Sequence, residues 1–363
     1  MKYPVFLPEG GRIGFPAPSF GCSIEPYRSA FDHAQEVLRS LGHGTIPGPN
    51  AYLGEGIGIS NTPEKCGEEL TKMYLSDETD ALISCGGGEL MCEILDYVDF
   101  AAIRQAPPKW YMGYSDNTNM VFLLATLCDT AAIYGPCAPT FGMEPWHQAV
   151  RDAYDLLRGK KLDNKGYPLF ELESLKDEDH PLIPYNLTEQ KKIRAFSGMK
   201  ECKPVAADAK SKKDTLHDQK DLVFEGRLIG GCLDCLVNLA GTCYDKVKEF
   251  NERYADDGII WFMESCDLNV MSIRRAVWEL DHAGWFSHVK GFLIGRPCCY
   301  GQELMGLDQY HAVVDLLGKY NVPILMDLDI GHLPPMMPLI VGSMTKVSYE
   351  TRTEDFHLQM SLS

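Results

Sequence analysis

The sequence lacks an apolar run of the roughly 18 residues that a membrane-spanning helix requires, and its first residues, MKYPVFLPEGG, lack the apolar core of a secretory signal peptide. Positive charge is also scarce, because 34 Lys and Arg stand against 51 Asp and Glu, for a net charge of −17. Such a charge repels nucleic-acid phosphates and anionic lipid surfaces. We therefore expect a soluble, cytoplasmic protein with neither nucleic-acid nor membrane partners.

Disulfides are not indicated, although the chain has 13 cysteines. The number is odd and the chain is not small, so we expect reduced thiols. Cys232 and Cys235 form a C-x-x-C pair, but no second pair follows at the spacing of a zinc site. Cys298 and Cys299 are adjacent and poorly placed to chelate one ion. We therefore expect no metal.

A dinucleotide cofactor is not indicated either. The glycine-rich segment 54–58 (GEGIG) has no strand before it. Its third glycine is also misplaced for the G-x-G-x-x-G pattern that cradles a pyrophosphate. We therefore expect no cofactor.

The 363 residues are enough for two domains. The first half alternates short apolar runs with helical periodicity, which is typical of an α/β fold around a parallel sheet. The pattern predicts strands over 80–84 and 110–113 and helices over 27–40, 89–98 and 117–128. Each strand leads into a tight turn and a helix N-terminus, where open α/β sheets place their ligand sites.

The alternating pattern fails between residues 188 and 222. The run 210–220 (KSKKDTLHDQK) has almost no apolar face, which is typical of a linker or mobile loop. Such a segment is either a solvated surface excursion or a flap that covers a substrate. We predict an N-terminal domain over 1–187, this linker, and a C-terminal domain over 223–363, whose last part alternates like antiparallel strands over 339–358.

The most informative motif is GYSDN at 113–117, which places Ser115 at a sharp strand-to-helix junction. That geometry exposes the hydroxyl and directs backbone N–H groups and the positive end of a helix dipole toward it. Taken alone, the motif fits a helix N-cap as well as a nucleophile. A serine nucleophile also needs a histidine base and an orienting carboxylate.

His332 is the best candidate for the base, because it follows a strand and Gly331 in a loop that two prolines stiffen. Glu264 is the best candidate for the carboxylate. It ends the apolar strand 259–264 (IIWFME), and a buried carboxylate needs a partner such as an imidazole N–H. Glu225 is the alternative candidate for this carboxylate, because Glu225 lies beside another turn.

Five motifs together resemble, in kind and order, those of the LD-carboxypeptidase family. They are the glycine turn at 86–88, 113–118 (GYSDNT), 230–233 (GGCL), 262–264 (FME) and 331–332 (GH). The resemblance covers nearly the whole chain. It implies a flavodoxin-like N-terminal α/β domain with a parallel sheet, a β-rich C-terminal domain, an active site between the two, and a homodimer.

The resemblance also implies the roles of individual residues. Ser115 matches the family's nucleophile, His332 its general base, and Glu264 its triad glutamate at about the family's spacing before the histidine, which decides against Glu225. The glycine turn resembles the family's oxyanion-hole glycines. Backbone N–H groups of Gly88 and Asp116 are therefore expected to bind the developing oxyanion.

The chain departs from the family at two motifs. Arg-Gly-Gly-Tyr-Gly is replaced here by GGGEL at 86–90, and Gly-Gly-Asn-Leu by GGCL at 230–233, so Glu89 and Cys232 are expected near the site. Neither change removes a triad atom. The length of the chain and its charged segment are more similar to the MccF-type branch, which confers self-immunity to microcin C, than to the muropeptide enzymes.

We therefore predict a serine carboxypeptidase or amidase that hydrolyses small peptidyl or aminoacyl-nucleotide conjugates, with an unidentified Arg or Lys binding a substrate carboxylate. One alternative is a muramoyl-tetrapeptide LD-carboxypeptidase that releases D-Ala. A second is a non-catalytic binding protein on the same scaffold. A third is a cysteine-dependent hydrolase, for which Cys85 is the only candidate because it follows a strand.

Overall fold

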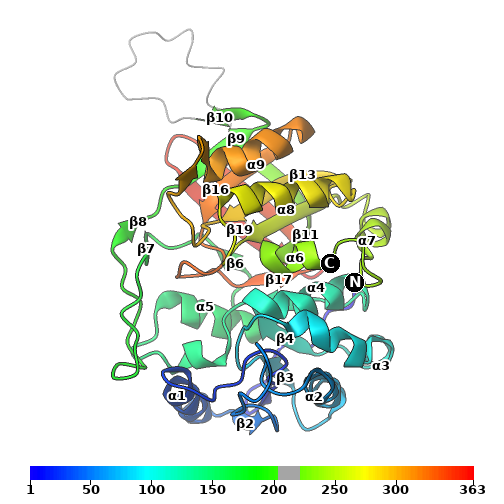
Figure 1. The fold of residues 1–363 in the computed structure, drawn as a ribbon, viewed down its shortest axis with the longest axis vertical. Coiled ribbons are helices and arrows are strands. Elements are labelled where there is room, and N and C mark those ends of the chain that lie inside the picture. Colours follow the sequence, from blue (N-terminus) through cyan, green and yellow to red (C-terminus); the bar gives the residue numbers. More distant parts are fainter. Residues whose placement is uncertain (203–220) are drawn as a thin grey trace.

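The N-terminal region of the computed structural model, which describes residues 1–202 and 221–363, is built on a six-stranded sheet (Figure 1). In spatial order its strands are β17 (Leu339–Val341), β5 (Ala132–Tyr134), β4 (Trp110–Gly113), β3 (Ala81–Ile83), β1 (Arg12–Phe15) and β2 (Gly44–Pro47). Strands β1 to β5 pair in parallel, and β17 is antiparallel to β5. Strands β3, β4 and β5 are wholly buried, as expected for parallel strands covered on both faces.

Helices cover both faces of this sheet. They are α1 (Tyr27–Ser40), α2 (Pro63–Leu75), α3 (Phe100–Gln105), α4 (Thr118–Thr126) and α5 (Gln148–Leu157), with 3-10 turns η1 (Met91–Tyr97), η2 (Ser115–Asn117) and η3 (Ala138–Gly142). The predicted helix 27–40 is confirmed, whereas 89–98 forms the 3-10 segment η1 rather than an α-helix. All residues of α4 are buried, because it lies between the N-terminal sheet and the C-terminal region (Figure 1).

The C-terminal region is built on a nine-stranded mixed sheet. In spatial order its strands are β10 (Lys200–Cys202), β9 (Arg194–Ser197), β16 (Pro323–Leu328), β13 (Val289–Gly295), β12 (Ile259–Glu264), β11 (Leu222–Cys232), β18 (Met344–Glu350), β19 (Asp355–Ser361) and β6 (Asp163–Asn164). Strands β11, β12, β13 and β16 are parallel, and the outer strands are antiparallel. The predicted class, an α/β fold with a parallel N-terminal sheet and a β-rich C-terminal region, is confirmed.

The remaining elements connect these strands. They are α6 (Leu233–Leu239), α7 (Val247–Arg253), α8 (Val270–His282), α9 (Gln309–Leu317), η4 (Gly318–Tyr320), and the short pairs β7 (Leu169–Phe170) with β8 (Glu189–Gln190) and β14 (Glu303–Leu304) with β15 (Leu307–Asp308). Helices α6, α8 and α9 lie together beside the C-terminal sheet in Figure 1. Within residues 1–202 and 221–363, no helix is both long and apolar enough to cross a bilayer.

The two regions exchange strands across the expected boundaries. Strand β17 comes from the C-terminal half but completes the N-terminal sheet, and β6 comes from the N-terminal half but joins the C-terminal sheet. The segment expected to be a linker also differs, because β9 pairs with β16 and buries Ala195 and Phe196. The charged run 210–220, expected to be the loop or flap, lies outside the described residues.

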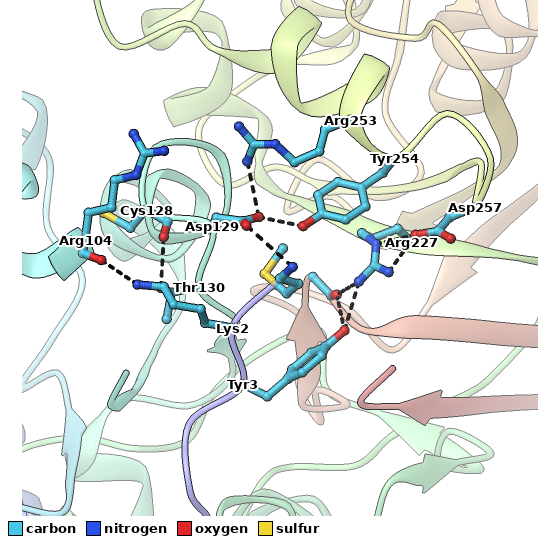
Figure 2. A network of polar contacts seen from close by, with 12 residues as sticks. Lys2, Tyr3, Arg104, Cys128, Asp129, Thr130, Arg227, Arg253, Tyr254 and Asp257 are labelled. Atoms are coloured by element: carbon cyan, nitrogen blue, oxygen red, sulfur yellow. Dashed lines mark hydrogen bonds and ion pairs between the residues drawn. The ribbon is translucent and has the colours of Figure 1, made fainter. Parts of the chain in front are cut away.

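A polar network joins the two regions on the side where the chain ends meet (Figure 2). Asp129 of the N-terminal region accepts a hydrogen bond of 2.6 Å from the hydroxyl of Tyr254, next to α7. Arg227 of β11 donates to the Tyr3 hydroxyl at 2.8 Å and forms an ion pair of 2.6 Å with Asp257. These contacts fix the relative position of the two sheets, on which the geometry of the site between them depends.

Candidate active site

Ser115 begins the η2 turn between β4 and α4, at the carboxyl end of the N-terminal parallel sheet. Its backbone φ is 62°, a left-handed conformation that a serine adopts only where the surroundings enforce it. The Ser115 N–H donates to the Tyr134 hydroxyl at 3.3 Å. A Cβ atom on Gly87 would lie 3.0 Å from the Ser115 Oγ, so the glycine lets the backbone approach the hydroxyl closely. The serine is thus held at a strained, sharp turn.

The side chain of His332 contacts Ser115 from the opposite region. Its Nε2 lies 2.8 Å from the Ser115 Oγ, and its Nδ1 lies 2.7 Å from Oε2 of Glu264. His332 follows β16 in the loop that begins near Gly331, whose φ is 100°. A Cβ atom on Gly331 would lie 2.3 Å from Oε2 of Glu264, so only glycine fits there. The three predicted side chains therefore form one hydrogen-bonded chain.

Glu264 lies at the buried carboxyl end of β12, and its side chain has no solvent exposure (0%). Its Oε1 accepts a hydrogen bond of 2.5 Å from the Tyr134 hydroxyl, so both carboxylate oxygens have partners. Glu225, the competing candidate, is exposed on β11 and lies opposite Lys346 of β18. Glu264 rather than Glu225 therefore contacts the histidine.

Tyr134 is a site residue that the sequence reasoning missed. It ends β5 and touches both Ser115 and Glu264. Its only sequence signal is a tyrosine that closes an apolar strand at the same sheet edge as the GYSDN motif, and a buried tyrosine hydroxyl needs a partner. It links the serine turn to the carboxylate.

The electrostatics of the site favour a charged His332 imidazolium beside a charged Glu264 carboxylate. Burial alone would lower the pKa of His332, but the charge of Glu264, with hydrogen bonds to Cys266 and Glu264, outweighs burial and holds this pKa well above its usual value. Burial alone would raise the pKa of Glu264, but His332 and the hydrogen bond from Tyr134 lower it. The carboxylate is therefore ionised in the folded protein and stabilises positive charge on the imidazole.

Two pockets meet at Ser115. The larger, about 300 Å³, has aromatic and glycine walls beside the histidine and is lined by Phe20, Cys22, Tyr27, Cys85, Gly86, Gly87, Gly88, Glu89, Tyr114, Ser115, Cys266 and His332. The smaller, about 150 Å³, is lined by Gly88, Glu89, Cys92, Ser115, Asp116, Asn119, Cys232, Asp234, Cys235, Asn238, Cys266 and Asp267. Glu89 and Cys232, the two departures from the family motifs, thus both lie beside the serine.

Of the two residues expected to form the oxyanion hole, Gly88 lines both pockets and Asp116 lines the smaller one. The Gly88 N–H has no acceptor within the described part of the chain. The Asp116 side chain is buried and accepts hydrogen bonds from the Ser19 hydroxyl at 2.5 Å and the Met91 N–H at 2.9 Å. Its carboxylate therefore anchors the turn.

Two family models match this chain. The LD-carboxypeptidase N-terminal domain matches residues 13–135, and the LD-carboxypeptidase C-terminal domain matches residues 225–347. The chain belongs to the LD-carboxypeptidase family. The two matches contain all the residues that meet at the site, from the glycine turn at 86–88 to His332.

Relatives of this LD-carboxypeptidase family member include MccF proteins. The microcin C7 self-immunity protein MccF of Escherichia coli is 22% identical over 95% of this chain and 93% of its own length. The MccF-like protein of Bacillus anthracis superposes with a TM-score of 0.79 at 19% identity over 100% of both chains. A structure of MccF in complex with glutamyl sulfamoyl guanosine superposes with a TM-score of 0.75 at 19% identity over 99% of both chains. The predicted LD-carboxypeptidase family is confirmed, and these likenesses support its MccF-type branch.

Ligand atoms of three residues of this family member lie within 4.8 Å of one another and could hold a metal ion: those of Cys232, Glu264 and His332. An ion there would have to replace the 2.7 Å contact between His332 and Glu264. Cys85, the candidate for a cysteine-dependent hydrolase, is fully buried. Burial raises the pKa of its thiol well above the usual value, which suppresses the reactive thiolate.

Proposed function

We propose that this member of the LD-carboxypeptidase family is a serine peptidase of the Ser-Glu-His type. The observation that carries the proposal is the hydrogen-bonded chain from Ser115 through His332 to Glu264, with contacts of 2.8 and 2.7 Å. Such a chain allows the hydroxyl proton to move to the imidazole as the oxygen attacks, while the carboxylate holds the resulting imidazolium.

In the proposed reaction, Ser115 attacks the carbonyl carbon of an amide bond and His332 takes its proton. Collapse of the tetrahedral intermediate breaks the C–N bond, and His332 returns the proton to the leaving amine. His332 then deprotonates a water molecule, which attacks the acyl-enzyme. His332 returns this proton to the Ser115 oxygen as the acid is released. Backbone N–H groups of Gly88 and Asp116 bind the oxyanion at both stages.

The proposed substrates are small peptidyl or aminoacyl-nucleotide conjugates. The support is the MccF relative that binds glutamyl sulfamoyl guanosine, together with the aromatic side chains of Phe20, Tyr27 and Tyr114 in the pocket beside His332. A planar leaving group could pack against these rings. We also propose that the protein acts in the cytoplasm as a homodimer, as is expected from the family.

Turnover tests this proposal. Purified protein is incubated with an aminoacyl sulfamoyl adenosine and, separately, with a tetrapeptide that ends in an L,D bond to D-Ala, and product release is followed by chromatography. The conjugate should be cleaved, and Ser115→Ala should abolish the cleavage. Release of D-Ala alone would favour a cell-wall substrate, and no turnover of either compound would contradict the peptidase proposal.

A further inference from the structure

The loop that follows β16 and carries His332, called here the histidine loop (residues 329–337), leaves the sheet through an unusual backbone conformation. Asp327, the last residue but one of β16, has a φ of 64°, a left-handed conformation that is uncommon outside glycine. Gln309 and Tyr310 of α9 donate to its two carboxylate oxygens at 2.7 and 2.6 Å. Such a conformation persists only where the surroundings enforce it, so the path of the histidine loop depends on side-chain contacts.

Arg296 contacts the histidine loop on both sides of His332. It directly follows β13 and is 1% exposed. Its Nη1 donates to the carbonyl oxygen of Asp327 at 2.9 Å, and its Nη2 donates to Oδ1 of Asp329 at 2.5 Å. Its Nη2 also donates at 3.5 Å to the carbonyl oxygen of Leu333, the residue after His332. One buried guanidinium therefore joins the start of the histidine loop to the residue beyond the histidine.

Asp329 connects this arginine to two further segments. Its Oδ2 accepts a hydrogen bond of 2.7 Å from the Tyr167 N–H, and its carbonyl oxygen accepts one of 2.7 Å from the Met337 N–H. A Cβ atom on Gly166 would lie 2.4 Å from the same Oδ2, so the backbone before Tyr167 closely approaches the carboxylate. Both oxygens of the Asp329 carboxylate are thus used, and the two ends of the histidine loop are bonded to each other.

The glycine before Arg296 brings these contacts close to the carboxylate of the proposed triad. A Cβ atom on Gly295 would lie 2.9 Å from the Cβ of Glu264 and 2.1 Å from the carbonyl oxygen of Ile330. The end of β13 therefore packs against both the strand end that carries Glu264 and the histidine loop. A shift of the loop at this point would change the 2.7 Å contact between Nδ1 of His332 and Glu264.

Stability alone is a weak reason for an ion pair at this place. The side chains of Arg296 and Asp329 are each 1% exposed, and apolar side chains of similar volume are often at least as stable as a buried ion pair. Neither residue lines either of the two pockets beside Ser115. An effect of the pair on the reaction therefore has to act through the position of His332.

We propose that Arg296, together with Asp329, is a positioning residue of the reaction. It fixes the histidine loop so that Nε2 of His332 stays within reach of the Ser115 hydroxyl while Nδ1 stays bonded to Glu264. A guanidinium suits this role, because its planar fork donates to several acceptors in fixed directions, which the single ammonium group of a lysine does not. The inference rests on the proposed function, since only there does His332 act as a base.

Arg296→Met combined with Asp329→Asn tests the proposal by steady-state hydrolysis of an aminoacyl sulfamoyl adenosine. The double variant removes both charges together, so no unpaired charge is left buried. Its kcat should fall by about 10- to 100-fold, as expected when a catalytic group is misplaced by about 1 Å. Its KM should stay close to that of the natural protein, because neither residue lines the pockets. Lys319→Met with Asp281→Asn makes the same change in the ion pair between η4 and α8 and should leave kcat unchanged.

The titration of His332 is a readout that a purely stabilising ion pair would not move. NMR of protein labelled with ¹⁵N-histidine follows the imidazole with pH, and the signals of His332 are assigned by their absence from His332→Gln. The midpoint should be lower in the double variant than in the natural protein and the Lys319 control, because the contact with Glu264 that raises this pKa is weakened. An unchanged midpoint or an unchanged kcat in the double variant, with folding verified by circular dichroism, would overturn the positioning role.

The proposed function and the positioning role can fail separately. If the natural protein cleaves no conjugate, the proposed function fails and the titration alone decides the role of Arg296. A lower midpoint for His332 in the double variant then supports this role, and equal midpoints overturn it. If the natural protein is active and the double variant is unchanged, the peptidase proposal stands and the positioning role is wrong.

Arg296→Lys keeps the test decisive if the double variant does not fold. A lysine retains the positive charge beside Asp329 but cannot reproduce the fork that also reaches the carbonyl oxygens of Asp327 and Leu333. The lysine variant should fold and show the same two changes, a lower kcat and a lower midpoint for His332, in smaller size. A folded lysine variant that equals the natural protein in both would overturn the proposal.

Discussion

Replacing Glu264 with glutamine keeps the size of the side chain and removes its charge from a position with no solvent exposure (0%). The imidazolium that forms on His332 during the reaction then loses a carboxylate at 2.7 Å. Opposite unit charges about 4 Å apart at an effective dielectric constant of about 20 attract by about 4 kcal/mol. That energy corresponds to about a thousandfold in rate at about 1.4 kcal/mol per factor of ten.

A second effect lowers the reaction rate of Glu264→Gln further. An amide can donate to Nδ1 of His332 and so stabilise the wrong tautomer, which in other triads accompanies a fall of about 10⁴-fold in kcat. We therefore expect Glu264→Gln to lower kcat by about 10³- to 10⁴-fold. Glu225→Gln makes the same chemical change on an exposed position of β11 and should leave kcat unchanged.

The pH dependence gives an independent readout of the same contact. His332 acts as a base only when neutral, so kcat/KM should rise with pH as His332 loses its proton. Because Glu264 holds the pKa of His332 above 6.5, the midpoint of this rise should lie above pH 6.5 in the natural protein. It should move to lower pH in Glu264→Gln.

The assay is steady-state hydrolysis of an aminoacyl sulfamoyl adenosine from pH 5 to 10, with circular dichroism to verify folding of each variant. Near-normal turnover by folded Glu264→Gln would refute the reasoning. A rise in kcat/KM whose pH midpoint is the same in Glu264→Gln as in the natural protein would also refute it, because the carboxylate would then not control the protonation of His332.

Three further predictions concern positions around this chain and the assembly. Tyr134→Phe removes the 2.5 Å hydrogen bond to Glu264, and at about 1.5–3 kcal/mol for a bond to a charged group it should lower kcat by about 10- to 100-fold, measured in the same assay. Gly87→Ala places a methyl group 2.9 Å from the Cβ of Ser115, and the displaced hydroxyl should cost about 100-fold in kcat, with thermal melting to show that the fold persists. Light scattering should give twice the 40.6 kDa mass of the chain, whereas a monomer at all concentrations would contradict the proposed homodimer.

Local sequence patterns predict much of the N-terminal fold. The helix over 27–40 matches the structure because its apolar residues follow a clear helical periodicity, and the strand over 110–113 matches because it is a short apolar run that leads into a tight turn. The strand exchanges of β17 and β6 could not be predicted in this way. Pairing between strands far apart in the sequence depends on tertiary packing, which periodicity does not encode.

Site residues that belong to a local sequence motif were predictable, whereas those brought together only by tertiary packing were not. Ser115, His332 and Glu264 each stand at a strand end with distinctive neighbours, and the resemblance to a family chose Glu264 over Glu225. Tyr134 has no such motif, since its partners come from η2 and β12. The smaller pocket beside Ser115 also escaped prediction, because its lining comes from η1, η2, α4, β11, α6 and the turn after β12.

The most direct test of Ser115 as the nucleophile is covalent labelling with a fluorophosphonate, followed by mass spectrometry of proteolytic peptides. The probe should form one adduct, on Ser115, because among the hydroxyls of residues 1–202 and 221–363 only this one has a histidine nitrogen at 2.8 Å backed by a buried carboxylate. Labelling should disappear in Ser115→Ala and persist in Cys85→Ala. An adduct that remains in folded Ser115→Ala, or that maps to another residue of the natural protein, would contradict the assignment.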